Sequence, residues 1–293
     1  MDVMTDLAPN EKYTNSAIRP DESDPYPDKP VGEYLTDVVS NDWVNDEYKL
    51  MVLKTHEKAL TAYAGQFFHL LCPTPDGAEV WMRRPMSVYK VDRPAGQIEF
   101  LYKCEGRGTK GMATLEPGDT FNISGPLGIG FHLDPAWKNI VVLGRGVGLA
   151  TLAPLSQLAA ENGVGVTAIL SARKKNLVMS EDLFRELGAE TVTVVDEDGS
   201  SDVENVEAIL EGLIADGKAD AFFTCGSSRL LKLMQNLGRK HDVPGQVAME
   251  QIMVCGVGAC YVCMRTFEIN GERTLKRVCR EGPVFNMQEA VGW

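Results

Sequence analysis

Four cysteines near the end of the chain constrain its fold and its chemistry more than any other feature. They follow the pattern Cys255-x4-Cys260-x2-Cys263-x15-Cys279. The first three match the spacing of plant-type [2Fe–2S] ligands, and a fourth cysteine from further along the chain completes such a set. The pattern therefore favours a [2Fe–2S] cluster and the transfer of single electrons.

Two glycines, Gly256 and Gly258, lie inside this motif. Glycine adopts positive φ readily, and without a side chain it lets backbone N–H groups point at sulfur. Structural zinc is the competing interpretation, but four-cysteine zinc sites usually consist of two separate short-spaced pairs. Such an arrangement is missing here, so zinc and unligated thiols are the weaker alternatives.

Composition and charge exclude several classes of function. The 293 residues, 44% hydrophobic and 24% charged, leave room for two domains and a small appendage. The net charge of −12 argues against a nucleic-acid partner, since a phosphate backbone requires a basic surface. No membrane span is expected, because the most apolar stretch, residues 139–155, is short and contains Arg145. Seven cysteines without a recognisable secretory signal indicate a reducing cytoplasm.

The hydrophobic pattern divides the chain into four parts. Residues 1–33 are rich in Asp, Glu, Pro and Asn and predict an acidic flexible tail, or a strap across another surface. Residues 34–135 contain short strand-like runs at roughly even spacing, which predict an antiparallel β-barrel. These runs are 34–44, 48–56, 66–73, 86–91, 97–104 and 119–126.

Strands and helices alternate in residues 136–242, which predicts a parallel α/β sheet. The expected strands are 139–144, 166–170, 192–195 and 220–225, and the expected helices are 149–161, 181–187, 203–215 and 228–239. Residues 243–293 hold the cysteine motif and form a third, small module. The predicted fold class is thus an antiparallel β-barrel followed by a parallel-sheet α/β domain and a C-terminal cluster module.

A glycine-rich loop follows the first strand of the α/β part. Gly144, Gly146 and Gly148 precede a helix, so the backbone can approach a pyrophosphate at a helix N-terminus. A tight turn that needs glycine for packing is the alternative. Cys225 and Gly226 end a later strand at the same edge of the sheet, where Cys225 can lie beside a nicotinamide ring or be an inert core residue.

Two segments of the barrel part suit a flavin nucleotide. Arg83 and Arg84 precede Pro85-Met86-Ser87, and an arginine fork can pair with a pyrophosphate while a serine hydroxyl bonds a flavin edge. The segment 106–110 supplies backbone N–H groups and the Thr109 hydroxyl. Each segment alone is equally well a solvated loop.

Taken in chain order, these motifs resemble the iron–sulfur/FAD electron-transfer subunit of class B dihydroorotate dehydrogenase, the PyrK family, within the ferredoxin–NADP reductase-like superfamily. The resemblance runs from about Tyr34 to Phe285 and includes MEQIMVCGVGACYVC and the later CREGPVF. It implies that FAD, a nicotinamide nucleotide and a cluster are held by three groups of residues. These are Arg84, Pro85, Met86, Ser87, Leu101, Tyr102, Lys103, Gly108 and Thr109 for FAD, Gly144–Gly148 for the nucleotide, and Cys255, Cys260, Cys263 and Cys279 for [2Fe–2S].

The choice between NADH and NADPH rests on two opposed signals. Arg173-Lys174-Lys175 follows the second α/β strand and can take a 2′-phosphate. The acidic segment 196–200 resembles that of NADH-using relatives, and we favour NADH. The helix after the glycines reads LATLAP, with its proline later than in relatives, which leaves the local geometry of this loop open.

The resemblance implies a relay from NAD(P)H through FAD and the cluster, with no catalytic acid, base or nucleophile. The expected partner is an FMN-containing, dihydroorotate dehydrogenase-like subunit of pyrimidine biosynthesis, in a hetero-oligomer. One alternative is a stand-alone or bifurcating NAD(P)H:ferredoxin-type oxidoreductase with a ferredoxin-type acceptor. Another is a non-catalytic redox regulator. The scattered histidines, 56, 69, 132 and 241, are expected to be packing or surface residues.

Overall fold

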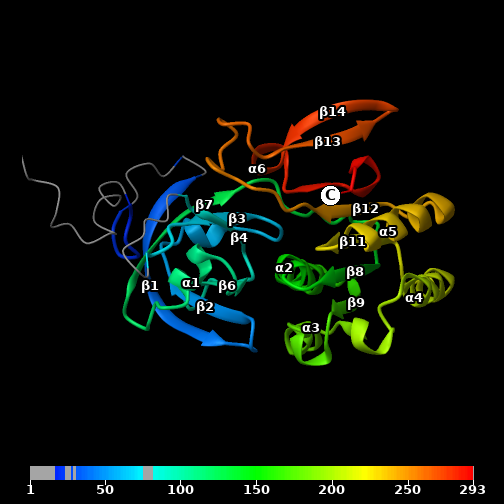
Figure 1. Ribbon diagram of the computed structural model, residues 1–293, viewed down its shortest axis with the longest axis horizontal. Coiled ribbons are helices and arrows are strands. Elements are labelled where there is room, and N and C mark those ends of the chain that lie inside the picture. The colour runs from blue at the N-terminus through cyan, green and yellow to red at the C-terminus, as the bar shows by residue number, and fades with distance from the viewer. Residues whose placement is uncertain (1–16, 24–27, 29–30, 75–81, 293) are drawn as a thin grey trace, which may run out of the picture. The chain divides into compact units, whose positions relative to one another are not determined.

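The computed structural model describes residues 17–23, 28, 31–74 and 82–292. The chain divides into two compact units, Met1–Leu127 and Gly128–Trp293, which are described separately (Figure 1). The predicted acidic tail lies largely outside the described residues. Where that segment is described, Ile18 is buried and pairs with Tyr34 through the hydrogen bonds Ile18 N–H to Glu33 O (2.8 Å) and Leu35 N–H to Ile18 O (3.0 Å).

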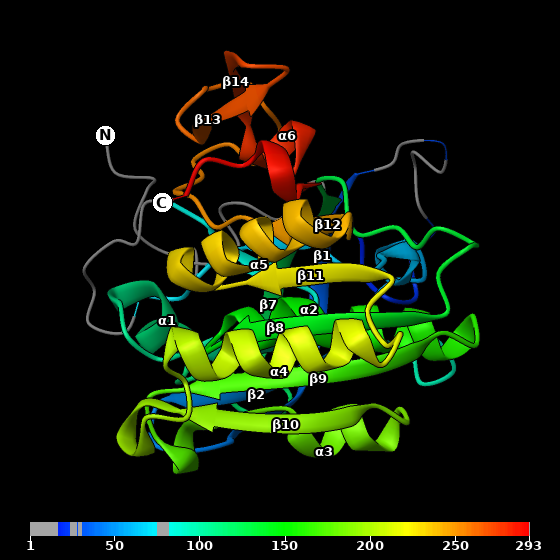
Figure 2. The same cartoon turned by 90° about the vertical axis from the view of Figure 1, so that its right-hand side faces the viewer.

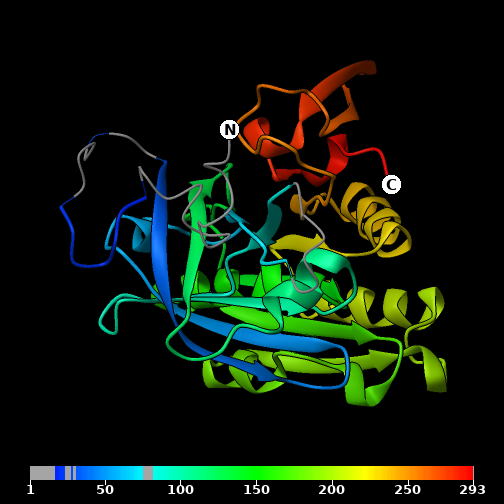
Figure 3. The same cartoon turned by 60° about the vertical axis from the view of Figure 1, so that its left-hand side comes forward.

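The described part of the first unit forms a seven-stranded antiparallel sheet in the order β4-β3-β7-β1-β2-β6-β5. Figure 3 shows the paired β1 and β7, in blue and green, side by side. β4 also contacts β6, so the sheet curves back on itself. The strands are β1 (Gly32–Trp43), β2 (Tyr48–Lys54), β3 (Phe67–Leu70), β4 (Arg84–Ser87), β5 (Lys90–Asp92), β6 (Gln97–Lys103) and β7 (Thr120–Leu127), with the helices η2 (Ala59–Thr61) and α1 (Arg107–Met112) between them.

Alternation along the strands places one set of side chains in the core of this unit. In β6, Ile98, Phe100 and Tyr102 are fully buried at every second position, as the period of a strand requires. Phe100 meets Phe68 of β3 edge to face, with ring centroids 5.8 Å apart. The predicted strand runs therefore form the expected antiparallel β-domain.

The second unit contains a six-stranded sheet, within the described residues, in the order β10-β9-β8-β11-β12-β15. All pairs are parallel except β12 with β15, which is antiparallel. The central strands β8, β9 and β11 are largely buried and apolar because helices cover both faces of the sheet. They are β8 (Asn139–Arg145), β9 (Gly165–Ala172), β10 (Glu190–Val195), β11 (Ala221–Cys225), β12 (Gly245–Ala248) and β15 (Val284–Asn286).

Figures 1 and 2 show α2 and α3 on one face of this sheet and α4 and α5 on the other. The chain leaves β8 toward β9 on one side and later returns to β11 on the other, so the strand order reverses between β8 and β11. Ligands of open α/β sheets bind at such a reversal, beyond the carboxyl ends of the strands. The helices are α2 (Gly148–Glu161), η3 (Lys175–Leu177), α3 (Glu181–Glu186), η4 (Asp196–Asp198), α4 (Val203–Ala215) and α5 (Ser228–His241).

The C-terminal segment joins the sheet through β15 and adds a separate antiparallel hairpin. Its remaining elements are β13 (Met264–Ile269), β14 (Glu272–Arg277), α6 (Val278–Glu281) and η5 (Met287–Glu289). The predicted fold class is confirmed, while the boundaries at residues 33, 135 and 242 stay predictions. Among the described residues, no helix is long and apolar enough to span a bilayer.

Candidate cofactor sites

The loop after β8 and the loop after β11 meet at the reversal of strand order. A Cβ on Gly148 would lie 2.5 Å from the Cys225 carbonyl oxygen, and a Cβ on Gly226 would lie 2.4 Å from the Arg145 carbonyl oxygen. Gly146 and Gly226 also adopt positive φ, of 55° and 95°. Glycine is therefore required for the close approach of these two loops. As a result, the N-terminus of α2 points at the carboxyl edge of the sheet.

Proline does not interrupt the helix that follows this loop. Pro154 is the seventh residue of α2, which continues to Glu161. The late proline noted in the sequence is therefore accommodated inside the helix, where it removes one backbone donor. The predicted residues Gly144, Gly148 and Gly226 all lie at this one edge of the sheet.

Cys225 is buried beside a carboxyl group that the sequence analysis did not single out. Burial raises the pKa of the Cys225 thiol, and the nearby Glu250 carboxylate raises it further, while a hydrogen bond with Thr151 opposes the change. Part of Glu250 is exposed, yet the surrounding protein raises the pKa of its carboxyl group by desolvation. Glu250 follows β12 and belongs to the MEQIMVCGVGACYVC signature, yet its neighbourhood with Cys225 arises only in the folded sheet.

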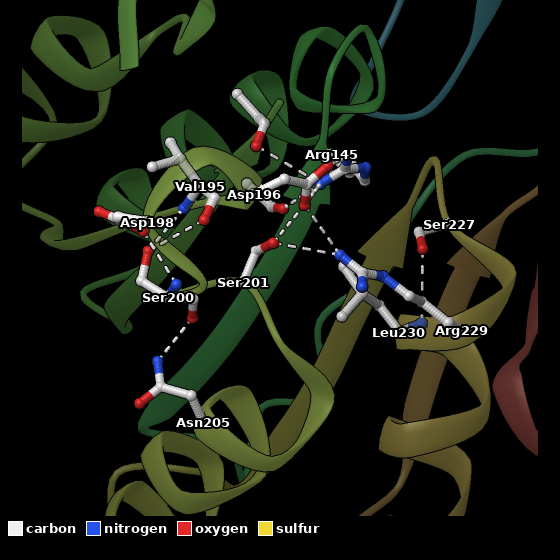
Figure 4. A network of polar contacts seen from close by, with 12 residues as sticks. Arg145, Val195, Asp196, Asp198, Ser200, Ser201, Asn205, Ser227, Arg229 and Leu230 are labelled. Atoms are coloured by element: carbon white, nitrogen blue, oxygen red, sulfur yellow. Dashed lines mark hydrogen bonds and ion pairs between the residues drawn. The ribbon is translucent and has the colours of Figure 1, made fainter. Parts of the chain in front are cut away.

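An ion-paired network spans the same edge of the sheet, from β8 past β9 to β10 and α5 (Figure 4). The Arg145 guanidinium donates to both carboxylate oxygens of Asp196, with Nη1–Oδ1 at 3.1 Å and Nη2–Oδ2 at 2.5 Å. Arg229 Nη2 donates to Asp196 Oδ1 at 3.2 Å, and the Ser201 hydroxyl donates to the same oxygen. Hydrogen bonds, first from Arg145 and then from Ser201, lower the pKa of Asp196 to about 2.

The basic segment after β9 is tied to the acidic segment after β10. Glu197 N–H donates to Arg173 O at 3.2 Å, and Lys175 N–H donates to Glu197 Oε1 at 3.1 Å. The two opposed specificity signals of the sequence are thus neighbours in space. Asp196 is the member of this group that two guanidinium groups hold in place.

The barrel unit brings Arg84 onto the start of α1. A Cβ added to Gly108 would lie 3.0 Å from Arg84 Nε, so the guanidinium lies directly over this glycine. Arg83 instead turns away: it donates to His69 O at 3.2 Å and pairs with Glu33 at 2.5 Å. The two arginines of the predicted fork therefore have separate roles, and Arg84 is the one beside Gly108.

Thr109 shapes this loop rather than presenting a free hydroxyl. Its Oγ1 accepts hydrogen bonds from Glu105 N–H at 3.0 Å and from Gly106 N–H at 3.1 Å. The first helical hydrogen bond runs from Lys110 N–H to Gly106 O. The backbone N–H groups before Lys110 therefore have no carbonyl partner within the helix. Arg84 and these backbone groups can together hold a pyrophosphate.

The remaining predicted flavin residues lie on two strands. Tyr102 points into the core, where its hydroxyl donates to Asn41 Oδ1 at 2.9 Å and burial raises its pKa. Met86 packs against the same core. Because the Tyr102 side chain is fully buried, only its backbone can contact a ligand outside the core. The other four, Pro85, Ser87, Leu101 and Lys103, lie on β4 and β6.

The four motif cysteines gather as two pairs. Cys260 N–H donates to Cys255 Sγ at 3.4 Å, while Cys263 Sγ and Cys279 Sγ lie 3.1 Å apart. Ala259 N–H also donates to Cys255 Sγ at 3.2 Å. Among the described residues, the thiols and other His, Cys, Asp or Glu side chains form no ready-made group of three or more that could hold a metal ion.

The surroundings of the sulfurs favour thiolate at Cys255 and the protonated thiol at Cys279. Burial acts to raise the pKa of Cys255, but hydrogen bonds from the backbone N–H groups of Cys260, Val257 and Ala259 outweigh it and lower the pKa to about 6. Burial and the shared hydrogen bond with Cys263 raise the pKa of Cys279 to about 12. Four thiols, amides directed at sulfur and a glycine-lined loop fit an iron–sulfur cluster.

Two family models match the chain at the candidate flavin and cluster sites. Residues 36–131 match the oxidoreductase FAD-binding domain, and residues 250–291 match the iron-sulfur cluster binding domain of dihydroorotate dehydrogenase B. Fold and sites together define a flavin and iron–sulfur oxidoreductase of the ferredoxin reductase-like class.

Curated relatives identify the family. The electron transfer subunit of dihydroorotate dehydrogenase B (NAD(+)) from Desulforamulus reducens is 34% identical over 233 residues, 80% of this chain and 88% of the relative. The same subunit from Bacillus cereus is 34% identical over 231 residues, 78% of this chain and 86% of the relative. The chain therefore belongs to the family of dihydroorotate dehydrogenase B electron transfer subunits.

Solved structures agree with this fold. An NADH-dependent reduced ferredoxin-NADP oxidoreductase, studied for flavin-based electron bifurcation, superposes with a TM-score of 0.73 at 26% identity and covers 87% of this chain and 89% of that one. The ferredoxin reductase of carbazole 1,9a-dioxygenase superposes with a TM-score of 0.59 at 20% identity, covering 74% and 68% of the two chains, and shows the fold alone.

Proposed function

We propose that this chain oxidises NADH and delivers single electrons to a partner flavoprotein through bound FAD and a [2Fe–2S] cluster. The observation that carries the proposal is the pairing of the four motif cysteines, with backbone N–H groups directed at Cys255 Sγ. When bound, FAD would accept the electron pair of a hydride donor and release the electrons one at a time, and the cluster would pass them on. The chain's own residues bind and orient these groups.

Each cofactor has its own set of residues in this proposal. The loops of Gly148 and Gly226 and the N-terminus of α2 hold the dinucleotide, with Cys225 at the nicotinamide end. Arg84 and the first turn of α1 hold the FAD pyrophosphate. Cys255, Cys260, Cys263 and Cys279 would hold the cluster, and their four thiols already lie as two neighbouring pairs.

Asp196 supports NADH over NADPH. We place the ribose at this edge of the sheet, where the Asp196 carboxylate accepts a hydrogen bond from a 2′-hydroxyl and keeps the guanidinium groups of Arg145 and Arg229 occupied, so that they do not bind a 2′-phosphate. The depressed pKa of Asp196, about 2, keeps this charge at every physiological pH. The relatives are named as subunits of an NAD(+)-dependent enzyme, which agrees with this choice.

Exposed apolar side chains around the cluster motif support a protein acceptor. Ile252, Val257 and Tyr261 are 68%, 51% and 57% exposed, and Cys260 between them is exposed too. Large apolar side chains exposed within one short segment favour a protein interface. We propose that the acceptor docks here and that it is a dihydroorotate dehydrogenase-like FMN subunit, because the relatives are subunits of that enzyme. The seven free thiols support a cytoplasmic location.

A stand-alone or bifurcating NAD(P)H:ferredoxin-type oxidoreductase is the second candidate. The similarity to the NADH-dependent ferredoxin-NADP oxidoreductase, over 87% of this chain, favours it. Purification of the native protein separates the two: a permanent subunit co-elutes with a second flavoprotein, whereas a stand-alone enzyme elutes alone and reduces added ferredoxin.

An anaerobic titration with NADH tests the proposed relay. We expect the flavin absorbance to bleach and a rhombic reduced [2Fe–2S] EPR signal to grow with it. A yellow protein with no EPR signal would reduce the function to that of a flavin reductase, and a colourless protein with bound zinc would overturn it.

A further inference from the structure

Arg277 contacts the cluster motif at two separate places. It ends β14, two residues before Cys279, and its Nη1 donates to Gly258 O at 2.9 Å. Its guanidinium carbon also lies 5.1 Å from the ring centroid of Tyr261, a distance suited to a cation–π contact. One side chain thus contacts the segment between Cys255 and Cys260 and the segment between Cys260 and Cys263.

The backbone of the cluster loop around Gly258 is closely packed against Arg277 and Arg280. Gly258 has a φ of 84°, and a Cβ there would lie 2.9 Å from Arg280 Cβ and 3.4 Å from Arg277 Nη1. The backbone next to Arg277 is fixed as well, since Val278 N–H donates to Cys263 O at 3.1 Å. Arg277 therefore links all three segments that separate the four cysteines.

Glu281 faces the same guanidinium from the far end of α6. Arg277 Nε donates to Glu281 Oε1 at 3.0 Å and to Oε2 at 3.1 Å, and Arg277 N–H donates to Oε2 at 2.7 Å. The two side chains are 28% and 36% exposed, so solvent screens them only in part. A positive and a negative charge are thus held in fixed positions beside the cysteine motif.

We propose that Arg277 is a positioning residue for the cluster loop and that the opposed charges of Arg277 and Glu281 set the reduction potential of the cluster. The proposal rests on the proposed function. Reduction adds one electron to the cluster, so a nearby positive charge stabilises the reduced form and a nearby negative charge stabilises the oxidised form. Arg277 raises the potential, and Glu281 moderates that effect.

An EPR-monitored redox titration of the intact protein with its cluster tests this. Arg277→Gln should lower the ratio of reduced to oxidised cluster at a fixed potential by about three- to tenfold, the range expected for a partly screened unit charge. Glu281→Gln should raise the same ratio by about as much. Loss of packing alone would not shift the two variants in opposite directions.

Arg273→Gln is the matched control. It removes the same charge from the same strand at an exposed position, about 13 Å back toward the start of β14, and should leave the ratio within twofold of wild type. Arg277→Lys keeps the charge but not the planar stacking, so it should keep the ratio and lose iron faster during gel filtration. Shifts of the same sign in Arg277→Gln and Glu281→Gln, or none, would overturn the proposal.

Loss of the cluster in Arg277→Gln would support the positioning role. The effect on the reduction potential would then be tested by Glu281→Gln alone, and an unchanged ratio of reduced to oxidised cluster in that variant would overturn the proposed tuning of the potential. Iron and sulfide assays of the wild-type protein come first. A wild-type protein without iron would contradict the proposed function itself, which keeps the two failures apart.

Discussion

Gly148 packs directly against Gly226: a Cβ on Gly148 would lie 3.0 Å from Gly226 N, and a Cβ on Gly226 would lie 3.4 Å from Gly148 Cα. The first residue begins α2 after β8, and the second follows β11. This contact joins the two loops on either side of the reversal in strand order. Because both residues lack a side chain, the N-terminus of α2 stays accessible at the carboxyl edge of the sheet.

Gly148→Ala should damage this junction. The new methyl group would clash with the Cys225 carbonyl at 2.5 Å, a backbone atom that cannot rotate away, and we expect a loss of about 1–3 kcal/mol in the free energy of unfolding. NADH-dependent flavin reduction should fall with it. Chemical denaturation and stopped-flow reduction measure both effects.

Gly212→Ala is the control for that substitution. Gly212 lies in α4 with nothing within 4 Å of the position of a Cβ, so alanine should raise helix stability by about 0.5–1 kcal/mol. If Gly148→Ala behaved like Gly212→Ala, the close approach of the two loops would be disproved.

Asp196→Ser should shift nucleotide preference toward NADPH. Without the carboxylate, the guanidinium groups of Arg145 and Arg229 are free to bind a 2′-phosphate, so the ratio of kcat/KM for NADPH over NADH should rise at least about tenfold. Steady-state reduction of ferricyanide with each nucleotide measures this ratio.

The double variant Asp196→Ser with Arg229→Ala provides the cross-check. It should lose most of the gain for NADPH, since one of the two cationic partners of the phosphate is removed. A single variant that keeps the wild-type preference would show that the ribose is recognised elsewhere.

Cys260→Ser should abolish the EPR signal of the cluster and the electron output to an acceptor protein. Reduction of flavin by NADH should stay within about twofold of wild type, because the residues proposed for NADH and FAD lie outside this motif. Cys104→Ser, which removes a free thiol near Thr109 in the barrel unit, should leave all three readouts unchanged. Loss of flavin reduction together with the cluster would contradict the proposed order of transfer.

His69 should make the stability of the barrel unit depend on pH. Burial, with a further contribution from Arg83, lowers the pKa of His69 from 6.5 to about 4. Below pH 6.5 His69 is protonated in the unfolded chain, whereas in the folded chain it stays neutral down to about pH 4. The contribution of the neutral, buried His69 to the free energy of unfolding is therefore complete above pH 6.5 and is lost as the pH falls from 6.5 to 4.

His69→Gln removes that titration, so between pH 7 and 4.5 the wild-type protein should lose about 2 kcal/mol more stability than the variant. Urea unfolding at several pH values measures the difference. His132→Gln, at an exposed histidine, is the control. Parallel pH profiles for wild type and His69→Gln would show that His69 is not the titrating group.

Patterns within short stretches of sequence predicted the elements of this fold well. The expected helix 203–215 is α4, Val203–Ala215, and the expected helix 149–161 is α2, which starts one residue earlier, at Gly148. The strand and helix period, the glycine loops and the cysteine spacing are all local properties, since each depends on residues close together in the chain. The membership of the family followed from the same motifs.

Patterns within short stretches of sequence could not predict the contacts between distant segments. Nothing in the sequence separates Arg83 from Arg84, yet strand pairing sends one to Glu33 and the other over Gly108. The family resemblance implies that Tyr102 contacts the flavin, and only the folded strand β6 shows that its side chain lies in the core, which leaves its backbone for such a contact. Glu250 belongs to the terminal signature with the cysteines, but its approach to Cys225 is visible only in the folded sheet.

The sequence by itself thus determined the types of element, their order and the ligand types available for each cofactor. Only the tertiary structure decided which loops meet, because strand order depends on the packing of the whole unit. The pairing of Cys263 with Cys279 and the ion pairs of Asp196 with Arg145 and Arg229 join residues 16, 51 and 33 positions apart. Their physical origin is the burial of apolar sheet faces, which fixes the backbone and leaves these polar side chains in reach of one another.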